Sequence, residues 1–262
     1  MKRLLIACAV AFLVAGFSAA QAEVRVTDLR CEYRRNPLGI DAARPRLSWA
    51  LESNERGQRQ TAYRVLVASS KESLRRDRGN LWDTGKVKSS NSVHVVYDGQ
   101  PLKSRQHCWW KVRAWDRDGK PSDWSQPARW ETALLTEQAW QAQWITDGKS
   151  NPEKPEGFYD DDPAPLFRQE LTVDKPVRRA RLYITGLGYY EASLNGSKVG
   201  DDLLTPGWTT YSERDLYNTY DVTDHLRRGE NCLGVMLGDG WYNVVPMSMC
   251  GRFNLRDYLT VG

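Results

Sequence analysis

Short runs in which apolar and polar residues alternate make up most of the chain from residue 24 onward. A period of two predicts half-buried β-strands, and the Gly, Pro, Asn and Asp residues between the runs predict turns. In the first half the predicted strands are Val24–Tyr33, Arg46–Leu51, Tyr63–Ala68, Ser92–Tyr97, Cys108–Trp115 and Ala128–Thr132. In the second half they are Leu166–Val173, Arg179–Thr185, Tyr189–Leu194, Asp215–Val222 and Asn231–Leu237, with a further strand-like segment at Phe253–Val261. We expect an all-β protein whose helix content is limited to a single turn at Asp224–Arg228.

The predicted strands fall into two groups with a polar, Pro-rich stretch between them. We assign residues 23–135 to one β-sandwich, 136–165 to a connector loop and 166–262 to a second β-sandwich. In the first sandwich, the strand Cys108–Trp115 and the turn Asp116-Arg117-Asp118-Gly119 resemble the last hairpin of a fibronectin type III domain. Within the second group, Asn195-Gly196 is a strong signal for a β-hairpin turn. The tryptophans of the first group, Trp49, Trp110 and Trp115, are assigned to core packing in preference to ligand binding.

The first 22 residues have a different pattern. Lys2 and Arg3 supply two positive charges, the apolar run Leu4–Phe17 follows, and small residues end at Ala20-Gln21-Ala22. The apolar run is shorter than the ~20 residues that a membrane-spanning helix needs. We therefore predict a cleavable signal peptide over residues 1–22 and a secreted or periplasmic protein without a membrane partner.

Composition narrows the functional classes. Lys and Arg (37) are interspersed with Asp and Glu (33), so no basic block indicates a nucleic-acid partner. The three histidines are scattered, and neither HExxH nor GxSxG occurs, which argues against a metalloprotease or a serine hydrolase. The 11 Trp and 12 Tyr residues, against 5 Phe, are typical of β-sandwich cores and of sugar-binding surfaces.

Four cysteines lie beyond the predicted signal peptide: Cys31, Cys108, Cys232 and Cys250. In an oxidising compartment the pairs Cys31–Cys108 and Cys232–Cys250 would each stay within one domain, and free buried thiols are the alternative. The acidic run Asp160-Asp161-Asp162 offers the oxygen ligands that calcium takes, but a solvated acidic loop is the preferred interpretation.

A series of ordered motifs then distinguishes the second half. They are Ile184-Thr185-Gly186-Leu187-Gly188-Tyr189-Tyr190-Glu191, Leu194-Asn195-Gly196, Val199-Gly200-Asp201, Pro206-Gly207-Trp208-Thr209, Tyr211 and Leu237-Gly238-Asp239-Gly240-Trp241-Tyr242-Asn243. This series resembles the N-terminal jelly-roll domain of bacterial α-L-rhamnosidases of glycoside hydrolase family 78. In the first half, Asn36-Pro37-Leu38-Gly39-Ile40-Asp41 and Pro45-Arg46-Leu47-Ser48-Trp49 resemble the opening of the fibronectin-like domain that precedes it. The resemblance covers nearly all of residues 23–262.

The resemblance implies that catalysis belongs to a different part of the protein. The family hydrolyses terminal L-rhamnose with inversion in an (α/α)6 barrel that comes later in the chain, and nothing in this sequence corresponds to that barrel. We therefore predict no catalytic residue, a missing C-terminal catalytic domain as partner, and a chain that is a fragment or truncated product ending inside the jelly roll. Asp201, Asp202, Asp239 and Glu191 are acids by residue type only.

A carbohydrate site is the remaining candidate function. Some jelly rolls related to this family bind L-rhamnose with calcium, so the resemblance implies a rhamnose-containing glycan as ligand and Ca²⁺ as an optional cofactor. The predicted carbohydrate-binding residues are Asp201, Asp202, Trp208, Tyr211, Asp239, Trp241, Tyr242 and Asn243, with Asp201 and Asp202 as candidate calcium ligands. Two other roles for these loops stay open, namely closing the sandwich end and packing against the missing barrel. For the protein, the alternative is a stand-alone exported adhesion or interaction protein without enzymatic activity.

Overall fold

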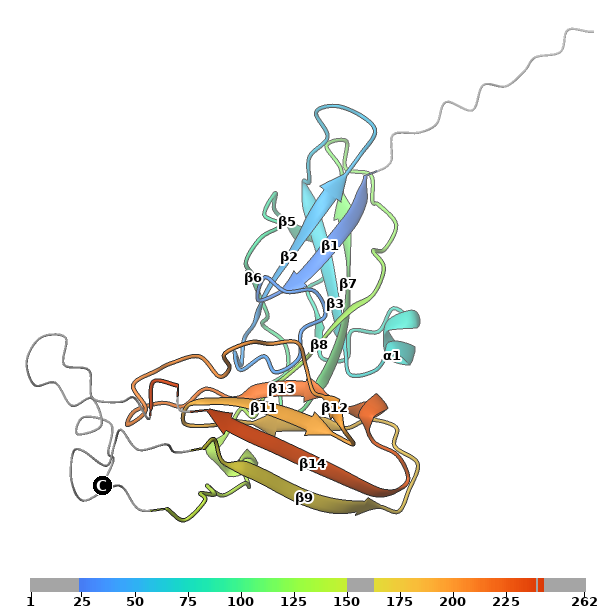
Figure 1. The fold of residues 1–262 in the computed structure, drawn as a ribbon. Coiled ribbons are helices and arrows are strands. Elements are labelled where there is room, and N and C mark those ends of the chain that lie inside the picture. The colour runs from blue at the N-terminus through green and yellow to red at the C-terminus, as the bar shows by residue number, and fades with distance from the viewer. Residues whose placement is uncertain (1–23, 150–162, 239, 243–262) are drawn as a thin grey trace, which may run out of the picture. The chain divides into compact units, whose positions relative to one another are not determined.

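A computed structural model describes residues 24–149, 163–238 and 240–242 of the chain. Several predictions fall outside the described residues: the signal peptide, Asp160–Asp162, Asp239, Asn243, Cys250 and Phe253–Val261. Helix in the described part is confined to α1 (Lys71–Arg75) and the short 3₁₀ helices η1 (Glu137–Ala139) and η3 (Thr223–His225), and the rest is strand and loop (Figure 1). The all-β prediction is confirmed. None of these helices has the length and apolar composition needed to cross a bilayer.

The described residues divide into two compact units that do not follow a single cut of the chain. The first unit holds the residues up to Arg35, residues 45–100 and residues 109–129. The second holds residues 36–44 and 101–108 and the residues from Trp130 onward. The linear domain bounds 23–135, 136–165 and 166–262 stay a prediction.

Two antiparallel sheets organise the first unit. One has the strand order β1 (Arg25–Cys31), β2 (Arg46–Glu52) and β6 (Val95–Val96). The other has the order β4 (Trp82–Asp83), β3 (Ala62–Ala68), β7 (His107–Trp115) and β8 (Ala128–Glu131), and β5 (Val87–Lys88) also pairs with β3. The ends of β7 and β8, residues 107–108 and 130–131, belong to the second unit.

The core of the first unit is built from the inward positions of these strands. Trp49 and Trp110 are buried, as predicted for core tryptophans, together with Val65, Val67 and Val112. Trp115 was also predicted in the core but is only half-buried, with Lys86 Nζ 4.5 Å from its ring centroid. A buried indole N–H needs an acceptor, and Trp49 Nε1 donates to Gln60 Oε1 at 2.9 Å.

The short helix α1 was not predicted, because five residues are too few to show a helical period. Ser70 caps it by accepting a hydrogen bond from the Ser73 backbone N–H at 3.1 Å. Leu74 anchors the helix because its side chain is buried against Leu66 and Ala68 of β3.

Two sheets also make up the second unit. The larger has the order β12 (Ser197–Lys198), β11 (Tyr189–Leu194), β14 (Gly229–Gly238) and β9 (Leu166–Val173). The smaller pairs β10 (Arg181–Ile184) with β13 (Asn218–Asp221). The turn between β11 and β12 has positive φ at Asn195 (53°) and Gly196 (81°), so the predicted hairpin is confirmed.

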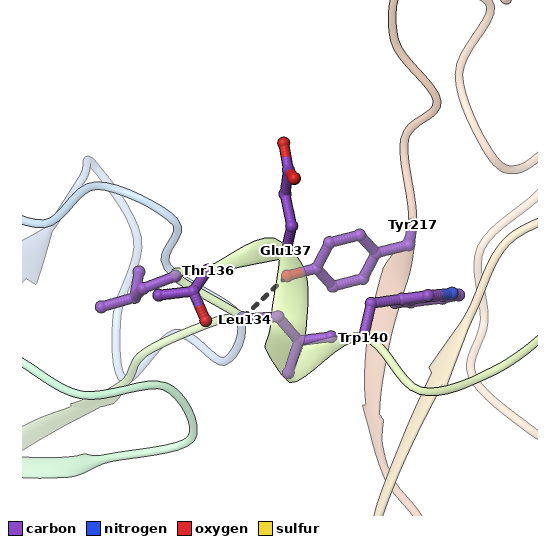
Figure 2. A pocket seen from close by; sticks show the side chains of 6 residues that line it. Leu134, Thr136, Glu137, Trp140 and Tyr217 are labelled. Atoms are coloured by element: carbon purple, nitrogen blue, oxygen red, sulfur yellow. Dashed lines mark hydrogen bonds between the residues drawn. The ribbon is translucent and has the colours of Figure 1, made fainter.

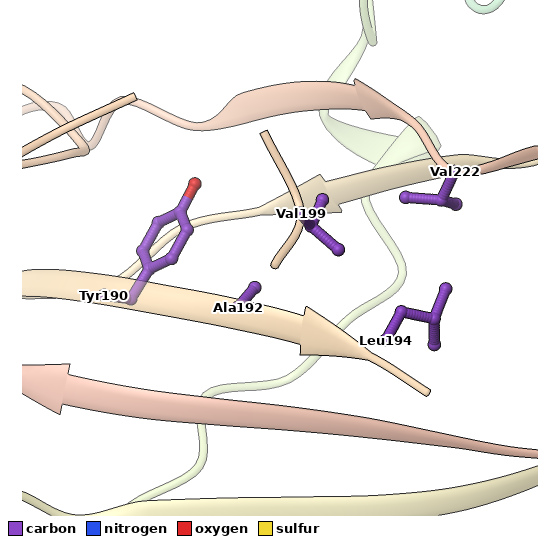
Figure 3. Close-up of a cluster of buried hydrophobic side chains, with 5 residues drawn as sticks. All are labelled: Tyr190, Ala192, Leu194, Val199 and Val222. Carbon is purple, nitrogen blue, oxygen red and sulfur yellow. The ribbon is translucent and has the colours of Figure 1, made fainter. Parts of the chain in front are cut away.

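Period-two alternation on β11 supplies the core of this unit. Tyr190, Ala192 and Leu194 point to one side of the strand and form a buried cluster with Val199 and Val222 (Figure 3). Partly buried side chains of β10, β13 and β14 pack against the same cluster: Leu182, Ile184, Tyr220, Leu233, Val235 and Leu237. The cluster is therefore shared by both sheets of the unit.

Several predicted strands are shorter in the structure: Ser92–Tyr97 is reduced to β6 and Arg179–Thr185 to β10. Asp215–Val222 was expected to be a strand, but β13 covers only Asn218–Asp221 because its partner β10 is only four residues long. Asp215 consequently lies in the loop that precedes β13.

Cys108 is buried and free, so the Cys31–Cys108 disulfide is not formed. Burial raises the pKa of the Cys108 thiol to about 12. Cys232 is half-buried and accepts a hydrogen bond from Arg168 Nε at 3.2 Å. Its candidate partner, Cys250, lies outside the described residues.

Candidate functional site

The loop that joins β12 to β13, residues 199–217, carries four of the predicted site residues and is here called the aromatic loop. Three hydrogen bonds hold its first part against the sheets. The Tyr190 backbone N–H donates to Thr205 O at 3.0 Å, and Thr205 Oγ1 donates to Asn218 Oδ1 at 2.9 Å. In the third hydrogen bond, the Tyr220 hydroxyl donates to Asp202 Oδ2 at 2.9 Å.

Glycine is required where the aromatic loop begins. Gly200 has a φ of 74°, in the left-handed region, and a Cβ added there would lie 2.4 Å from Cε1 of Tyr220. Any side chain would displace the Tyr220 ring. The hydroxyl of that ring holds Asp202, so the glycine positions one of the predicted site residues.

The second part of the aromatic loop folds back on itself. The Arg214 and Glu213 N–H groups both donate to Thr210 O at 2.9 Å, and the Thr209 hydroxyl donates to Arg214 O. Gly207 lies beside Leu216, whose Cδ1 is 3.5 Å from the position of an added Cβ. These contacts bring residues 207–209 close to residues 214–216.

Two aromatic pairs link this loop to the residues that follow β14. The rings of Trp208 and Trp241 have centroids 5.7 Å apart and planes inclined by 32°. Tyr211 and Tyr242 meet edge to face at 5.5 Å. The structure thus brings together four predicted site residues that are about thirty positions apart in sequence.

Trp208 is 65% exposed and Trp241 is 48% exposed. Tryptophans that close the end of a β-sandwich would be buried, so this exposure favours a surface that faces outward. Trp241 reaches its position because Gly240 packs directly on Gly188, where an added Cβ would lie 2.8 Å from the Gly188 Cα.

The acidic residues predicted as calcium ligands, Asp201 and Asp202, do not form a complete metal site with other described residues. Asp201 and Asp202 are exposed, and one oxygen of Asp202 is occupied by Tyr220. Within the described ranges, no three His, Cys, Asp or Glu side chains are close enough to hold a metal ion. Asp239 and Asn243 lie outside those ranges. A calcium ion at Asp201 and Asp202 stays a prediction, for which the described residues offer no third ligand of these types.

Glu191, an acid by residue type, lies away from the buried cluster on the exposed side of β11. Its carboxylate forms an ion pair with Lys198 Nζ at 2.8 Å.

Asp215 is a residue of this loop that our sequence analysis missed. Its Oδ1 is buried and has no hydrogen-bond partner among the residues the structure describes. Burial raises the pKa of the Asp215 carboxyl above its ordinary value. The negative charge of Asp215 also helps to raise the pKa of Tyr211, after burial and Tyr189, so Asp215 acts on a predicted site residue. No signal in the sequence marked Asp215, which was placed at the start of a predicted strand.

A second carboxylate of this unit, Glu131, has the opposite surroundings. Its side chain is 2% exposed, and Oε2 accepts from Arg181 Nη2 at 2.9 Å and Nε at 3.1 Å. His107 Nε2 lies 2.6 Å from the same oxygen. Arg181 Nη1 also contacts Asp221 Oδ1 at 2.7 Å.

These contacts determine the ionisation of Glu131. Burial by itself would raise the pKa of the Glu131 carboxyl, but the hydrogen bonds and charges of His107 and Arg181 lower it overall. The four residues Glu131, His107, Arg181 and Asp221 form a partnered ion cluster, which indicates a structural role.

A shallow hollow lies elsewhere in the second unit. Leu134, Leu135, Thr136, Glu137, Trp140 and Tyr217 line it (Figure 2). The Tyr217 hydroxyl accepts a hydrogen bond from Leu134 N at 2.9 Å, and the Trp140 and Tyr217 rings are 5.4 Å apart. None of the residues that line this hollow was predicted as a site residue.

Comparison with known proteins decides the family. Residues 26–136 match the model of the Rha78A-like N-terminal immunoglobulin domain, and residues 175–260 match the α-L-rhamnosidase N-terminal domain. The chain carries the N-terminal domains of the α-L-rhamnosidase family. The resemblance stated from the sequence motifs is therefore confirmed, with the first domain described as an immunoglobulin-type β-sandwich.

Individual α-L-rhamnosidases agree with the family models. One from Formosa agariphila is 38% identical over 227 residues, which cover 80% of this chain and 23% of the relative. The solved α-L-rhamnosidase from Dictyoglumus thermophilum superposes with a TM-score of 0.77 and 43% identity, over 83% of this chain and 25% of its own. The α-L-rhamnosidase from Aspergillus terreus superposes with a TM-score of 0.71 and 34% identity, over 84% of this chain and 24% of its own. The chain thus spans about a quarter of the length of the α-L-rhamnosidases it matches.

Proposed function

We propose that this chain is the non-catalytic N-terminal part of a secreted α-L-rhamnosidase that releases terminal L-rhamnose from glycosides. The observation that carries the proposal is the pair of N-terminal domain matches, in order, over residues 26–136 and 175–260.

The activity test compares the 262-residue chain with the complete protein on p-nitrophenyl α-L-rhamnopyranoside. We expect release of nitrophenol by the complete protein and none by the 262-residue chain. Release by the chain alone would contradict the non-catalytic assignment. A complete protein without activity on any rhamnoside would instead favour the adhesion or interaction protein.

Export is part of this proposal and rests on the sequence pattern of residues 1–22. We expect the mature protein to begin at Glu23 and to be recovered outside the cytoplasm. N-terminal sequencing of the protein purified from its own cells tests the cleavage site. An unprocessed N-terminus at Met1 would rule out the signal peptide.

For the aromatic loop we propose carbohydrate binding, with the exposed Trp208–Trp241 pair as the observation that favours it. The apolar C–H face of a sugar stacks well on an exposed indole ring. A sugar placed between two rings needs their centroids roughly 7–8 Å apart, since each contact takes about 3.5–4 Å. The 5.7 Å separation excludes that arrangement, so a sugar would stack on an outer ring face.

Calorimetry of the chain with L-rhamnose, with and without calcium, tests this binding. We expect heat of binding at millimolar sugar that is lost in Trp208→Ala. Trp144→Ala is the matched control, because Trp144 is similarly exposed (60%) but lies outside the aromatic loop. Absence of binding in both conditions would rule out the sugar site. Binding that is unchanged without calcium would rule out only the metal.

A second candidate role for the same loop is packing against the rest of a longer rhamnosidase. The observation that favours it is the exposure of Leu203 (79%) and Leu204 (72%), because such side chains are more typical of protein interfaces than of sugar sites. Leu204 also has a φ of 51°, which is strained for a bulky residue. We expect a Leu203→Asp, Leu204→Asp variant to lower the thermal midpoint of the complete protein but not that of the 262-residue chain.

A further inference from the structure

Cationic side chains gather on one face of the sheet β4–β3–β7–β8 in the first unit. Where β3 pairs with β7, Arg64 lies opposite Arg113 and Leu66 lies opposite Lys111. Directly opposite residues share a face of the sheet, and the alternate positions of β7, such as Val112, are buried in the core. Arg64, Lys111 and Arg113 therefore belong to the face that is turned away from the core.

Three tryptophan rings hold these cations and others from neighbouring segments. The cationic groups lie 4.5–6.0 Å from the ring centroids, where the negative face of an indole ring attracts a positive charge. They are Lys71 and Arg129 at Trp109, Lys86 at Trp115, and Arg64, Lys111 and Arg113 at Trp124. The rings thus keep together like charges that repel one another.

Helix α1 adds further positive charge to the same face. It is anchored by Leu74, which packs on Leu66 and Ala68, and these two residues lie opposite Lys111 and Trp109 in the β3–β7 pairing. Three further cations of α1 and of the residues just after it are exposed to solvent: Arg75, Arg76 and Arg78. These three and the six cations at the tryptophan rings are here called the cationic face.

The acids of the same segments do not balance this charge. Asp83 pairs with Arg64, and Asp77 pairs with Lys111. Lysines and arginines outnumber the acids of these segments, which are Glu72, Asp77, Asp83 and Asp123. Among the described residues, no carboxylate forms an ion pair with three exposed members of the cationic face, Lys71, Arg75 and Lys86. The face therefore has uncompensated positive charge that a partner can reach.

The surroundings of the cationic face limit the class of partner. A membrane-binding surface combines cations with large exposed apolar side chains. In the first unit those side chains, Tyr33, Val93 and Val96, lie on or beside β1 and β6 of the other sheet. A single-stranded nucleic acid stacks its bases on exposed aromatic rings, whereas the three rings here are half-buried and already carry the protein's own cations. These observations favour a partner that is recognised by its negative charges alone.

We propose that the cationic face binds an acidic polysaccharide, whose carboxylates pair with the exposed lysine and arginine side chains. Each such contact is a charge-assisted hydrogen bond, which is stronger than a neutral one. A glycan is chosen over other polyanions because of the proposed role in a glycoside hydrolase, and in that choice the inference rests on the proposed function. The cationic face itself lies in the first unit and includes no residue of the aromatic loop.

The principal test is calorimetry of the 262-residue chain with polygalacturonate. We expect binding in about 0.05 M salt and its loss in about 1 M salt, where the Debye length falls to roughly 3 Å. Uncharged dextran of the same length should not bind. Absence of binding to polygalacturonate, or equal binding of dextran, would overturn the proposal.

Two triple variants distinguish the cationic face from net charge. In the first, Lys71→Gln, Arg75→Gln and Lys86→Gln together should weaken binding at least about tenfold. The control makes the same change of charge at three exposed cations outside the face, with Arg25→Gln, Lys103→Gln and Lys198→Gln, and should bind as tightly as the unchanged chain. All six side chains are exposed, so both variants should keep the thermal midpoint of the unchanged chain. Equal weakening in the two variants would show that net charge alone is recognised and would overturn the site.

The class of polyanion is tested with duplex DNA and with phosphatidylglycerol vesicles, at equal concentrations of negative charge. We expect polygalacturonate to bind more tightly than either, because a flexible glycan can follow charges spread over the sheet and α1, whereas duplex DNA is stiff over about 50 nm. Equal or tighter binding of DNA or vesicles would overturn the polysaccharide. A complete protein that hydrolyses the rhamnoside but does not bind polygalacturonate would contradict this inference alone, and binding without hydrolysis would contradict the proposed function alone.

Discussion

Two carboxylates of the second unit, Glu131 and Asp215, differ in their hydrogen-bond partners and in the direction of their pKa shifts. Glu131 is almost completely buried and is met by Arg181 and His107 at 2.6–3.1 Å, which lowers its pKa despite the burial. Asp215 is less buried, yet its Oδ1 has no donor among the described residues, and its pKa is raised.

The comparison shows that burial alone does not determine the pKa shift or the structural role of a carboxylate. Where cations and donors surround it, the acid stabilises the fold by joining elements of the structure, here β8 with β10. Where the fold leaves a buried acceptor without a donor among the described residues, as at Asp215 Oδ1, stability is lost. Four variants test this contrast, taken from the largest expected effect to the smallest.

Glu131→Ala is expected to have the largest effect. It removes the shared partner of Arg181 and His107, and breaking a buried ion pair from one side lowers the free energy of unfolding by about 3–5 kcal/mol. Urea denaturation followed by tryptophan fluorescence measures the change. The control is Glu52→Ala, whose exposed pair with Arg25 at 3.7 Å should contribute less than about 1 kcal/mol. Equal effects of the two variants would remove the basis for calling the cluster structural.

Arg181→Lys is expected to have an intermediate effect. The guanidinium contacts Glu131, Asp221 and the Ala180 carbonyl at the same time, whereas an ammonium group cannot reproduce that planar arrangement. We expect a loss of about 1–3 kcal/mol in the free energy of unfolding, measured in the same way. Arg25→Lys provides the exposed control, and a similar loss there would show that the geometry of Arg181 is unimportant.

Asp215→Asn should increase stability, and the gain should depend on pH. Since the pKa of Asp215 is raised in the folded state, its contribution is present below the unfolded pKa and is lost as pH rises through the folded pKa. The variant should therefore be more stable than the unchanged chain near pH 7, by about 1 kcal/mol, and the difference should vanish near pH 3.

Glu131 should show the opposite dependence on pH. Its lowered pKa means that its contribution is present above the unfolded pKa and is lost as pH falls through the folded pKa. Thermal midpoints of the unchanged chain, Asp215→Asn and Glu131→Gln across this pH range compare the two signs. A gain for Asp215→Asn that is the same at both ends of the range would contradict the account of Asp215.

Trp208→Ala should have the smallest effect on stability. The side chain is 65% exposed, so its removal should change the free energy of unfolding by no more than about 0.5–1 kcal/mol. Trp110→Ala is the reference for a fully buried tryptophan and should cost about 3–5 kcal/mol. A large loss in Trp208→Ala would mean that the aromatic loop is part of the core and not a surface kept for a ligand.

Much of the fold could be predicted from local pattern. The alternation in Tyr189–Leu194 and the turn Asn195-Gly196 correctly predicted β11 and its hairpin, because both depend on side-chain period and turn chemistry within a few residues. The limit of β13 could not be predicted in this way. The length of β13 is limited by its pairing partner β10, which has only four residues and lies more than thirty positions earlier in the chain.

The candidate site divides in the same manner. Trp208, Tyr211, Trp241 and Tyr242 could be selected in advance because aromatic and turn-forming residues recur in recognisable motifs. Asp215 could not, because what distinguishes it is the lack of a hydrogen-bond donor around its Oδ1, and no sequence pattern records an absent contact. The ion cluster around Glu131 could not be predicted from the sequence either, because Glu131 and Arg181 are 50 positions apart.

The sequence by itself determined the all-β class, most of the strands, the hairpin at Asn195-Gly196 and the family resemblance, since each depends on residues that are near one another in the chain. Only the tertiary structure decided which carboxylate is satisfied and which is not. Partners of a buried charge come from distant segments, and their distances decide whether that charge is stabilised or left unsatisfied.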